Sequence, residues 1–191
     1  MGSTMTSAGY LLFDTDIGRC GLSWGGCAVT GVLLPEESEE ATRRRMQRLN
    51  PTLAEGTQDA PALALYAVER IRALLHGERD DLLDLPLDMS RLPSFHRRVY
   101  ETVRRVGPGR TITYGELAGR LGEPGAARAV GQALSRNPFA PVVPCHRVLA
   151  APGALSGYRS GGFSAGGGVS TKLRMLQIEG ARLGLGPGLF D

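Results

Sequence analysis

Residues 113–136 read TYGELAGRLGEPGAARAVGQALSR, and this stretch predicts two short helices joined by a tight turn. Thr113 and Glu116 have the spacing of a capping box, in which each side chain satisfies a free backbone amide at the start of a helix. The glycines of residues 122–125 supply the turn, and a second helix is expected over residues 126–136. Two helices with a short glycine-containing turn are the pattern of a helix-turn-helix.

The second of these helices consists mostly of small residues. Ala126, Ala127, Ala129 and Gly131 would let a partner approach the helix backbone closely, and Arg128 would project from this thin surface. Either the small residues pack against another helix while Arg128 lies in solvent, or the helix approaches a nucleic acid. The composition of the helix alone leaves both interpretations open.

Charge is divided unevenly along the chain, whose formal net charge is +3. Residues 1–92 carry 9 basic and 14 acidic side chains, whereas residues 93–191 carry 13 basic and 5 acidic ones. A surface that faces a polyanion is therefore expected in the second half. The alternative is that these arginines only solvate an ordinary surface.

The first half has the pattern of a small α/β domain, which we place at residues 1–92. Three short apolar runs in residues 9–34 predict an antiparallel meander. Helices are expected from Ser38 to about Arg48 and from Pro61 to about Gly77, and a further strand over residues 82–89. This half offers no catalytic chemistry of its own.

The second half, residues 93–191, is expected to be mostly helical. Ser94 is positioned to cap a helix over residues 95–106, which Gly107-Pro108-Gly109 would end. The fold class predicted for the whole chain is therefore α+β: a small N-terminal domain with an antiparallel sheet, then a winged-helix-like C-terminal domain with the helix-turn-helix.

Residues 137–148, NPFAPVVPCHRV, carry the chemistry. Three prolines restrict the backbone before Cys145 and His146. A cysteine becomes a good nucleophile when a base or a positive charge favours its thiolate, and Arg147 adds such a charge. Adjacent side chains of an extended segment point to opposite sides, so a Cys–His contact here needs a turn or a bridging water. A buried structural cysteine is the simpler alternative for the dipeptide alone.

The three cysteines, Cys20, Cys27 and Cys145, favour a reducing compartment over a disulfide framework. Residues 1–13 lack the basic and apolar regions of a secretory signal, and no apolar run is long enough to span a membrane. We expect a cytoplasmic protein without membrane contact. Cys20 and Cys27 lack a zinc-binding spacing, so no metal is expected.

The combination of the Pro-Cys-His-Arg-Val segment, the preceding Asn-Pro and the two helices resembles the O6-alkylguanine-DNA alkyltransferase family, over about residues 95–183. The resemblance implies that Cys145 takes the alkyl group from O6 of guanine, or from O4 of thymine, and keeps it. It also implies that His146 accepts the thiol proton through a water, that Glu179 orients His146, that Tyr114 donates to N3 of the leaving guanine, and that Asn137 is a hinge. No cofactor is implied.

The resemblance further implies a monomer that binds double-stranded DNA containing O6-alkylguanine through the minor groove, with little sequence specificity and with the damaged nucleotide turned out of the helix. Arg128 would fill the vacated space. The implied DNA-binding set is Arg128, Ala126, Ala127, Ala129, Gly131 and Thr113, and the implied substrate pocket is Leu134, Val148, Tyr158 and Ser160.

The chain departs from the family pattern between Tyr158 and Glu179, where it is longer and richer in glycine. The donor to O6 is therefore left open among Ser160, Ser164 and a glycine amide. Three other functions are weighed: a relative that binds alkylated DNA without chemistry, a winged-helix DNA-binding regulator, and a cysteine hydrolase that uses Cys145 and His146.

Overall fold

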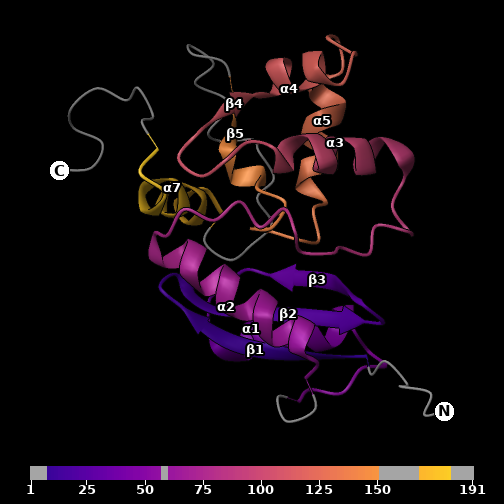
Figure 1. The fold of residues 1–191 in the computed structure, drawn as a ribbon, viewed down its shortest axis with the longest axis vertical. Coiled ribbons are helices and arrows are strands. Elements are labelled where there is room, and N and C mark those ends of the chain that lie inside the picture. Colours follow the sequence, from indigo (N-terminus) through magenta and orange to yellow (C-terminus); the bar gives the residue numbers. More distant parts are fainter. Residues whose placement is uncertain (1–7, 57–59, 151–167, 182–191) are drawn as a thin grey trace.

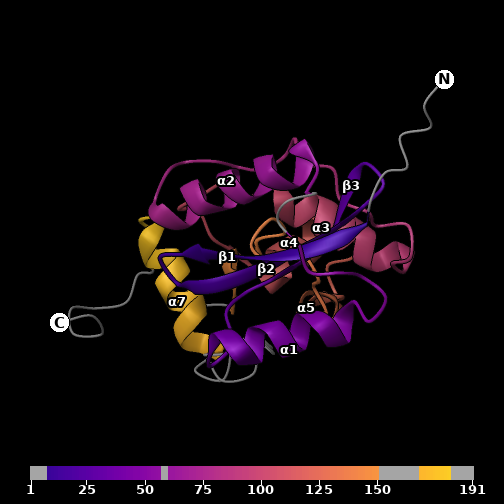
Figure 2. The same ribbon diagram turned by 90° about the horizontal axis from the view of Figure 1, so that it is seen from below.

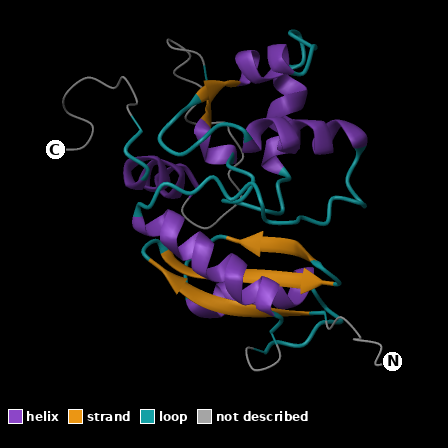
Figure 3. Ribbon diagram, in the orientation of Figure 1, coloured by secondary structure: helices purple, strands orange, loops and turns teal. Residues whose placement is uncertain are grey.

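The structure is a computed structural model that describes residues 8–56, 60–150 and 168–181 of the chain. A sheet with two helices forms one part, and the remaining helices form the other (Figures 1 and 3). In chain order the elements are β1 (Gly9–Thr15), β2 (Gly18–Gly25), β3 (Ala28–Leu33), α1 (Glu39–Leu49), α2 (Ala62–His76), α3 (Ser94–Arg104), β4 (Ile112–Thr113), α4 (Tyr114–Arg120), α5 (Ala127–Ser135), the 3-10 turn η1 (Cys145–Arg147), β5 (Val148–Leu149) and α7 (Gly168–Ile178).

The sheet is the expected antiparallel meander, in the order β1-β2-β3. Helices α1 and α2 lie on opposite sides of it (Figure 2). Because side chains alternate along a strand, Leu11 and Phe13 of β1 join the larger apolar cluster with Ile71 of α2, whereas Leu12 joins a second cluster with Met46 of α1. The sheet is thus buried on both faces.

Two expectations for local structure are wrong. Residues 82–89 form turns and a single bridge instead of a strand, because Leu82 has a φ of 54° and the carboxylates of Asp80 and Asp88 accept from backbone amides two residues later. Ser94 is the first residue of α3 and not its cap; Pro93 holds the cap position, and no side chain caps this end.

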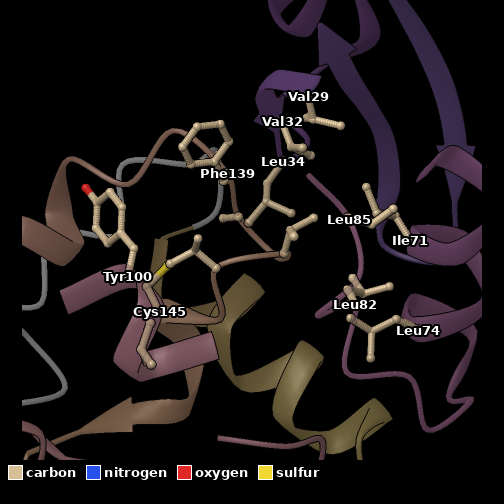
Figure 4. Close-up of a cluster of buried hydrophobic side chains, with 14 of the residues drawn as sticks. Val29, Val32, Leu34, Ile71, Leu74, Leu82, Leu85, Tyr100, Phe139 and Cys145 are labelled. Carbon is tan, nitrogen blue, oxygen red and sulfur yellow. The ribbon is translucent and has the colours of Figure 1, made fainter. Parts of the chain in front are cut away.

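The free edge of β3 attaches the second half of the chain to the sheet. The Val32 amide donates to the Pro138 carbonyl at 2.8 Å. On the same edge, the Val29 amide donates to the carbonyl of Pro86, which still belongs to the first half, at 2.9 Å. Figure 4 shows Val32 and Leu34 near Phe139, in the apolar cluster that also contains Tyr100 and Cys145. The segment that precedes Cys145 is therefore packed directly on the N-terminal half.

The two short helices form as expected. Thr113 and Glu116 complete the capping box of α4, and the turn to α5 contains Gly122 at a φ of 77°. Arg98 of α3 donates to the Leu121 carbonyl in this turn at 2.8 Å. The strands described in this half, β4 and β5, are two residues each and pair in parallel, so the winged-helix detail is not confirmed. Among the described residues, no helix is long and apolar enough to cross a membrane.

Candidate active site

Cys145 begins a single 3-10 turn directly after Pro144. Its side chain is buried, with 7% of the residue exposed, and its Sγ accepts a hydrogen bond from Asn137 Nδ2 at 3.3 Å. Burial raises the pKa of the Cys145 thiol, whereas the hydrogen bond from Asn137 and the positive charge of Lys172 lower it. Because burial is the largest of these effects, a base is needed to take the thiol proton.

Asn137 connects the end of α5 to the Cys145 segment. Its Nδ2 donates to the Val143 carbonyl at 2.7 Å as well as to the Cys145 sulfur, and its Oδ1 accepts from the Phe139 amide at 2.9 Å. The side chain uses both amide hydrogens and a carbonyl lone pair, so it fixes the segment in one conformation. The hinge role of Asn137 stays a prediction.

His146 and Glu179 form a buried pair across 33 residues of sequence. His146 Nε2 lies 2.8 Å from Glu179 Oε1. Burial alone would raise the pKa of Glu179, but hydrogen bonds and charge from His146 and Arg147 outweigh it and hold the pKa at about 2. Burial lowers the pKa of His146 against the opposing effect of Glu179. The pair therefore contains an ionised carboxylate and a neutral imidazole.

The protonation of this pair fixes the tautomer of His146. An ionised carboxylate only accepts hydrogen bonds, so Nε2 must carry the hydrogen that it donates to Glu179. Nδ1 then keeps a free lone pair. In the described part of the chain, Nδ1 is buried and has no hydrogen-bond partner. The turn thus presents an unused base next to Cys145.

Two further groups hold Glu179, and the sequence interpretation did not assign them to it. Arg147, which is 2% exposed, donates to both carboxylate oxygens and to the Val106 carbonyl. The Gly109 amide donates to Glu179 Oε2 at 3.2 Å. Gly107-Pro108-Gly109 signalled a turn, but nothing local in the sequence indicated that its partner lies 70 residues later.

Lys172 is a third group whose role the sequence did not indicate. Its Nζ donates to the Val148 carbonyl at 2.6 Å, and burial lowers its pKa. Val148 is fully buried and pairs with Ile112 between β5 and β4. Lys172 thus occupies one of the two lone pairs of the carbonyl of Val148, a residue of the implied substrate pocket.

Tyr114 is the first residue of α4, and its ring lies over α5. A Cβ built on Gly131 would lie 3.7 Å from this ring, so Gly131 gives the ring its space. Burial raises the pKa of Tyr114, and the negative charge of a Cys145 thiolate adds to the effect. Tyr114 therefore keeps its proton at neutral pH. Leu134, on the same helix as Gly131, is 6% exposed.

Most of the residues expected to bind DNA lie at the start of α4 and α5, and Gly131 lies in the middle of α5. Arg128 and Ala129 are exposed, and Ala126 and Ala127 are half-buried. Thr113 uses its hydroxyl within the capping box, where it accepts from the Glu116 amide at 3.1 Å and donates to the Glu116 carboxylate at 2.8 Å.

Two of the expected pocket residues, Tyr158 and Ser160, lie outside the described residues, as does Ser164. In the described ranges, no group of three or more histidine, cysteine, aspartate or glutamate side chains could hold a metal ion.

A cavity of about 350 Å³ lies between the two halves of the chain, and Cys145 is one of its lining residues. Leu134, Asn137 and Ala140 line it from the second half. In the first half of the chain, β3 and α1 supply the other wall.

Comparisons with known proteins agree on one family. Residues 94–181 match the family model described as "6-O-methylguanine DNA methyltransferase, DNA binding domain". The methylated-DNA–protein-cysteine methyltransferase of Mycobacterium tuberculosis is 36% identical over 182 residues, which are 95% of this chain and 98% of that protein. A protein of Thermus thermophilus named as a DNA base-flipping protein is 44% identical over 137 residues, 71% of this chain and 87% of its own length.

A solved structure agrees with the sequence matches. The crystal structure of the Mycobacterium tuberculosis protein OGT in complex with DNA has a TM-score of 0.68 to this chain at 33% identity, and the match covers 89% of this chain and 91% of that one. The similarity therefore extends over both halves of the chain and includes the α+β arrangement.

Proposed function

Because this chain belongs to the methylated-DNA–protein-cysteine methyltransferase family, we propose that it repairs DNA by moving an alkyl group from O6 of guanine to the sulfur of Cys145. The observation that carries the proposal is that His146, which lies 2.8 Å from Glu179, shares one 3-10 turn with Cys145, whose sulfur Asn137 contacts at 3.3 Å. A carboxylate, a neutral imidazole and a thiol in this order form a nucleophile with its base.

The proton leaves Cys145 through a water to Nδ1 of His146. The buried, unpartnered lone pair of Nδ1 supports this path, and the ionised Glu179 stabilises the imidazolium that results. Lys172 and Asn137 stabilise the thiolate while it exists. Burial disfavours the positive charge of a protonated His146, but the Glu179 carboxylate, 2.8 Å away, stabilises this charge, so His146 can accept the proton.

The thiolate attacks the alkyl carbon, a carbon–sulfur bond forms, and the carbon–O6 bond breaks with its electron pair on the guanine. Tyr114 donates its proton, or a hydrogen bond, to N3 of the leaving base. Its raised pKa supports this role, because the phenol is protonated when the reaction needs a donor. The product is a thioether, which has no hydrolytic exit, so each protein acts once.

Helices α4 and α5 bind the duplex through its minor groove, with little dependence on base sequence. The exposure of Arg128 and the small residues around it support this arrangement, because they allow close approach and leave one long side chain to enter the base stack. The damaged nucleotide turns out of the stack to reach Cys145, and Arg128 takes its place. Binding is by a monomer and weakens with salt.

The free state of all three cysteines supports a place in the reducing cytoplasm.

The similarity to the Thermus base-flipping protein favours one second candidate, a protein that recognises the lesion without chemistry. The two hydrogen-bonded pairs, Asn137 with Cys145 and His146 with Glu179, argue for transfer instead, since recognition alone needs no nucleophile with a base. No comparable observation on the described residues favours the winged-helix DNA-binding regulator or the cysteine hydrolase.

One experiment decides between these functions. The protein is incubated with a duplex that contains O6-methylguanine, and the peptide that contains Cys145 is weighed, with Cys145→Ala as the control. We expect one methyl group on Cys145 of the wild type and none on the variant, which still binds the duplex in an anisotropy titration. An unmodified peptide after prolonged incubation would overturn transfer, and release of more than one methyl group per protein would overturn single turnover.

A further inference from the structure

One buried hydroxyl lies where α5 ends and the segment that leads to Cys145 begins. Tyr100 of α3 is fully buried, and its hydroxyl donates to the Ala133 carbonyl at 2.8 Å. Ala133 is in the last turn of α5, four residues before Asn137. We propose that Tyr100 is a positioning residue, whose hydroxyl holds the end of α5 so that Asn137 meets the Cys145 sulfur. For alkyl transfer, this inference rests on the proposed function.

The backbone at the end of α5 leaves a place for this hydroxyl. In a regular α-helix the Asn137 amide would donate to the Ala133 carbonyl, four residues earlier. Here the Asn137 amide donates to the Leu134 carbonyl instead, at 3.2 Å. The Arg136 amide donates to the Ala133 carbonyl at 3.1 Å. The helix therefore tightens into 3-10 spacing before Asn137, and Tyr100 takes the second lone pair of the Ala133 carbonyl.

The packing of α3 on α5 holds the phenol in one orientation. Ala133 is fully buried, and its small side chain lets the Tyr100 ring reach the backbone of α5. The ring of His96, one turn earlier in α3, lies 6.1 Å from the Tyr100 ring at an angle of 52°. Tilted pairs of this kind are favourable contacts between rings. The hydroxyl is thus directed at one carbonyl.

Tyr100 lies within electrostatic range of Cys145. Figure 4 shows both side chains in one buried cluster. Burial raises the pKa of Tyr100, and the negative charge of a Cys145 thiolate raises it further, against a smaller opposite effect of Arg136. The phenol therefore keeps its hydrogen when the thiol ionises, and it still donates to Ala133 while the thiolate exists.

Asn137 is the link between this hydrogen bond and the sulfur. Its Nδ2 lies 3.3 Å from Cys145 Sγ, and this contact lowers the pKa of the thiol. Loosening of the last turn of α5 would move Asn137 away from the sulfur, and the thiolate would lose a donor. Tyr100 thus acts on the ionisation of Cys145 through Asn137.

The test compares Tyr100→Phe with Tyr10→Phe. Each change removes one buried hydroxyl and keeps the ring, so the volume of the core is conserved. Tyr10 is the matched control because it is 2% exposed, lies in the apolar cluster on the other face of the sheet, and donates to Glu55. The rate at which iodoacetamide modifies Cys145 is followed by peptide mass from neutral to alkaline pH. Methyl transfer from the O6-methylguanine duplex is measured beside it at neutral pH.

The other groups that influence the thiol are the same in both variants. Lys172 of α7 lowers its pKa, His146 shares its turn, and the pKa of Tyr114 in α4 responds to its charge. Because none of these side chains is replaced, a change in the pH dependence that occurs only in Tyr100→Phe reports on the hydroxyl of Tyr100.

We expect Tyr100→Phe to slow both reactions at neutral pH by about threefold to tenfold, the effect of one lost hydrogen bond. Its iodoacetamide rate should reach that of the wild type at alkaline pH, where both thiols are ionised, and Tyr10→Phe should match the wild type throughout. A core that is only loosened would change the rate at every pH. Wild-type rates at neutral pH, or a deficit that persists at alkaline pH, would overturn the inference.

Asn137→Ala tests the link itself. This variant should react slowly with iodoacetamide at neutral pH, and adding Tyr100→Phe should slow it no further. A further loss as large as in the wild-type background would overturn the path through Asn137. Absence of methyl transfer by the wild type would overturn the proposed function, whereas the iodoacetamide profiles would still decide whether Tyr100 positions Asn137.

Discussion

The guanidinium of Arg147 donates to Glu179 from two nitrogens, Nε to Oε2 at 3.0 Å and Nη2 to Oε1 at 2.8 Å. The second of these oxygens is the one that His146 contacts. Arg147 therefore keeps Glu179 ionised and in place while His146 receives the thiol proton. The sequence predicts that the charge of Arg147 favours the Cys145 thiolate. In the structure, Arg147 instead contacts the Glu179 carboxylate.

Removal of Arg147 should destabilise the protein strongly. Arg147→Met leaves a buried carboxylate without its main cation, which typically costs about 3–5 kcal/mol of folding free energy. Adding Glu179→Gln removes the unpaired charge, so the double variant should regain part of the loss. Urea unfolding of both single variants and the double variant measures the coupling; strictly additive losses would show that the two side chains do not stabilise each other.

Acid should weaken folding in two ranges of pH. The folded-state pKa values of His146 and Glu179 both lie below their ordinary values, 6.5 and 4.5, so each contributes stability that is present above that value and is lost as the pH falls. Loss begins below pH 6.5 through His146 and steepens below pH 4.5 through Glu179, whose pKa of about 2 corresponds to roughly 3 kcal/mol.

This pH dependence is measured by urea midpoints of the wild type and of Glu179→Gln between pH 7 and pH 3. The glutamine variant should lose the steeper phase, and the difference between the two proteins should shrink toward low pH. Asp80 and Asp84 also have lowered pKa values, but both proteins retain them, so the difference isolates Glu179. A difference that grows with acid would contradict the assignment.

Gly109→Ala should slow alkyl transfer and destabilise the fold. Gly109 has a φ of 74°, and a Cβ there would meet the Glu179 backbone oxygen at 2.7 Å, so Glu179 must move. Gly122→Ala is the matched control, since Gly122 has a φ of 77° and nothing lies within 4 Å of its Cβ. Both variants should lose about 1 kcal/mol or more from the left-handed conformation.

Only the Gly109 variant should also lose transfer rate, measured in single turnover with the O6-methylguanine duplex under conditions where both variants are folded. Equal rates in the two variants would mean that the contact with Glu179 does not position the base.

Arg128→Ala should slow repair of a duplex more than reaction with the free O6-methylguanine base. Turning a nucleotide out of the stack costs a few kcal/mol, so we expect the duplex rate to fall by about tenfold or more relative to the free base. Arg91→Ala removes an equal charge from an exposed position outside α4 and α5 and should change both rates alike. Equal losses on both substrates in Arg128→Ala would remove the evidence for base extrusion.

Elements set by local chemistry were predictable. The meander, α1 with its Ser38 cap, α2 ending at Gly77 and the capping box of Thr113 all follow from residues within a few positions of one another. The prediction of a strand over residues 82–89 was wrong. Its apolar residues suggested a buried strand, but aspartate side chains accept hydrogen bonds from nearby backbone amides and stabilise turns instead. Leu82 and Leu85 are indeed buried, but from turns.

By itself, the sequence determined the types of group that react, namely a cysteine, a histidine and a carboxylate beside a helix-turn-helix, because motifs record chemistry in residue identity. The tertiary structure alone decided that Arg147 and Gly109 hold Glu179, that Lys172 lies on the Val148 carbonyl, and that α1 walls a cavity at Cys145. These contacts join residues 24 to about 100 positions apart, and their energy comes from burial and charge pairing that exist only after the chain has folded. No local pattern records such pairings.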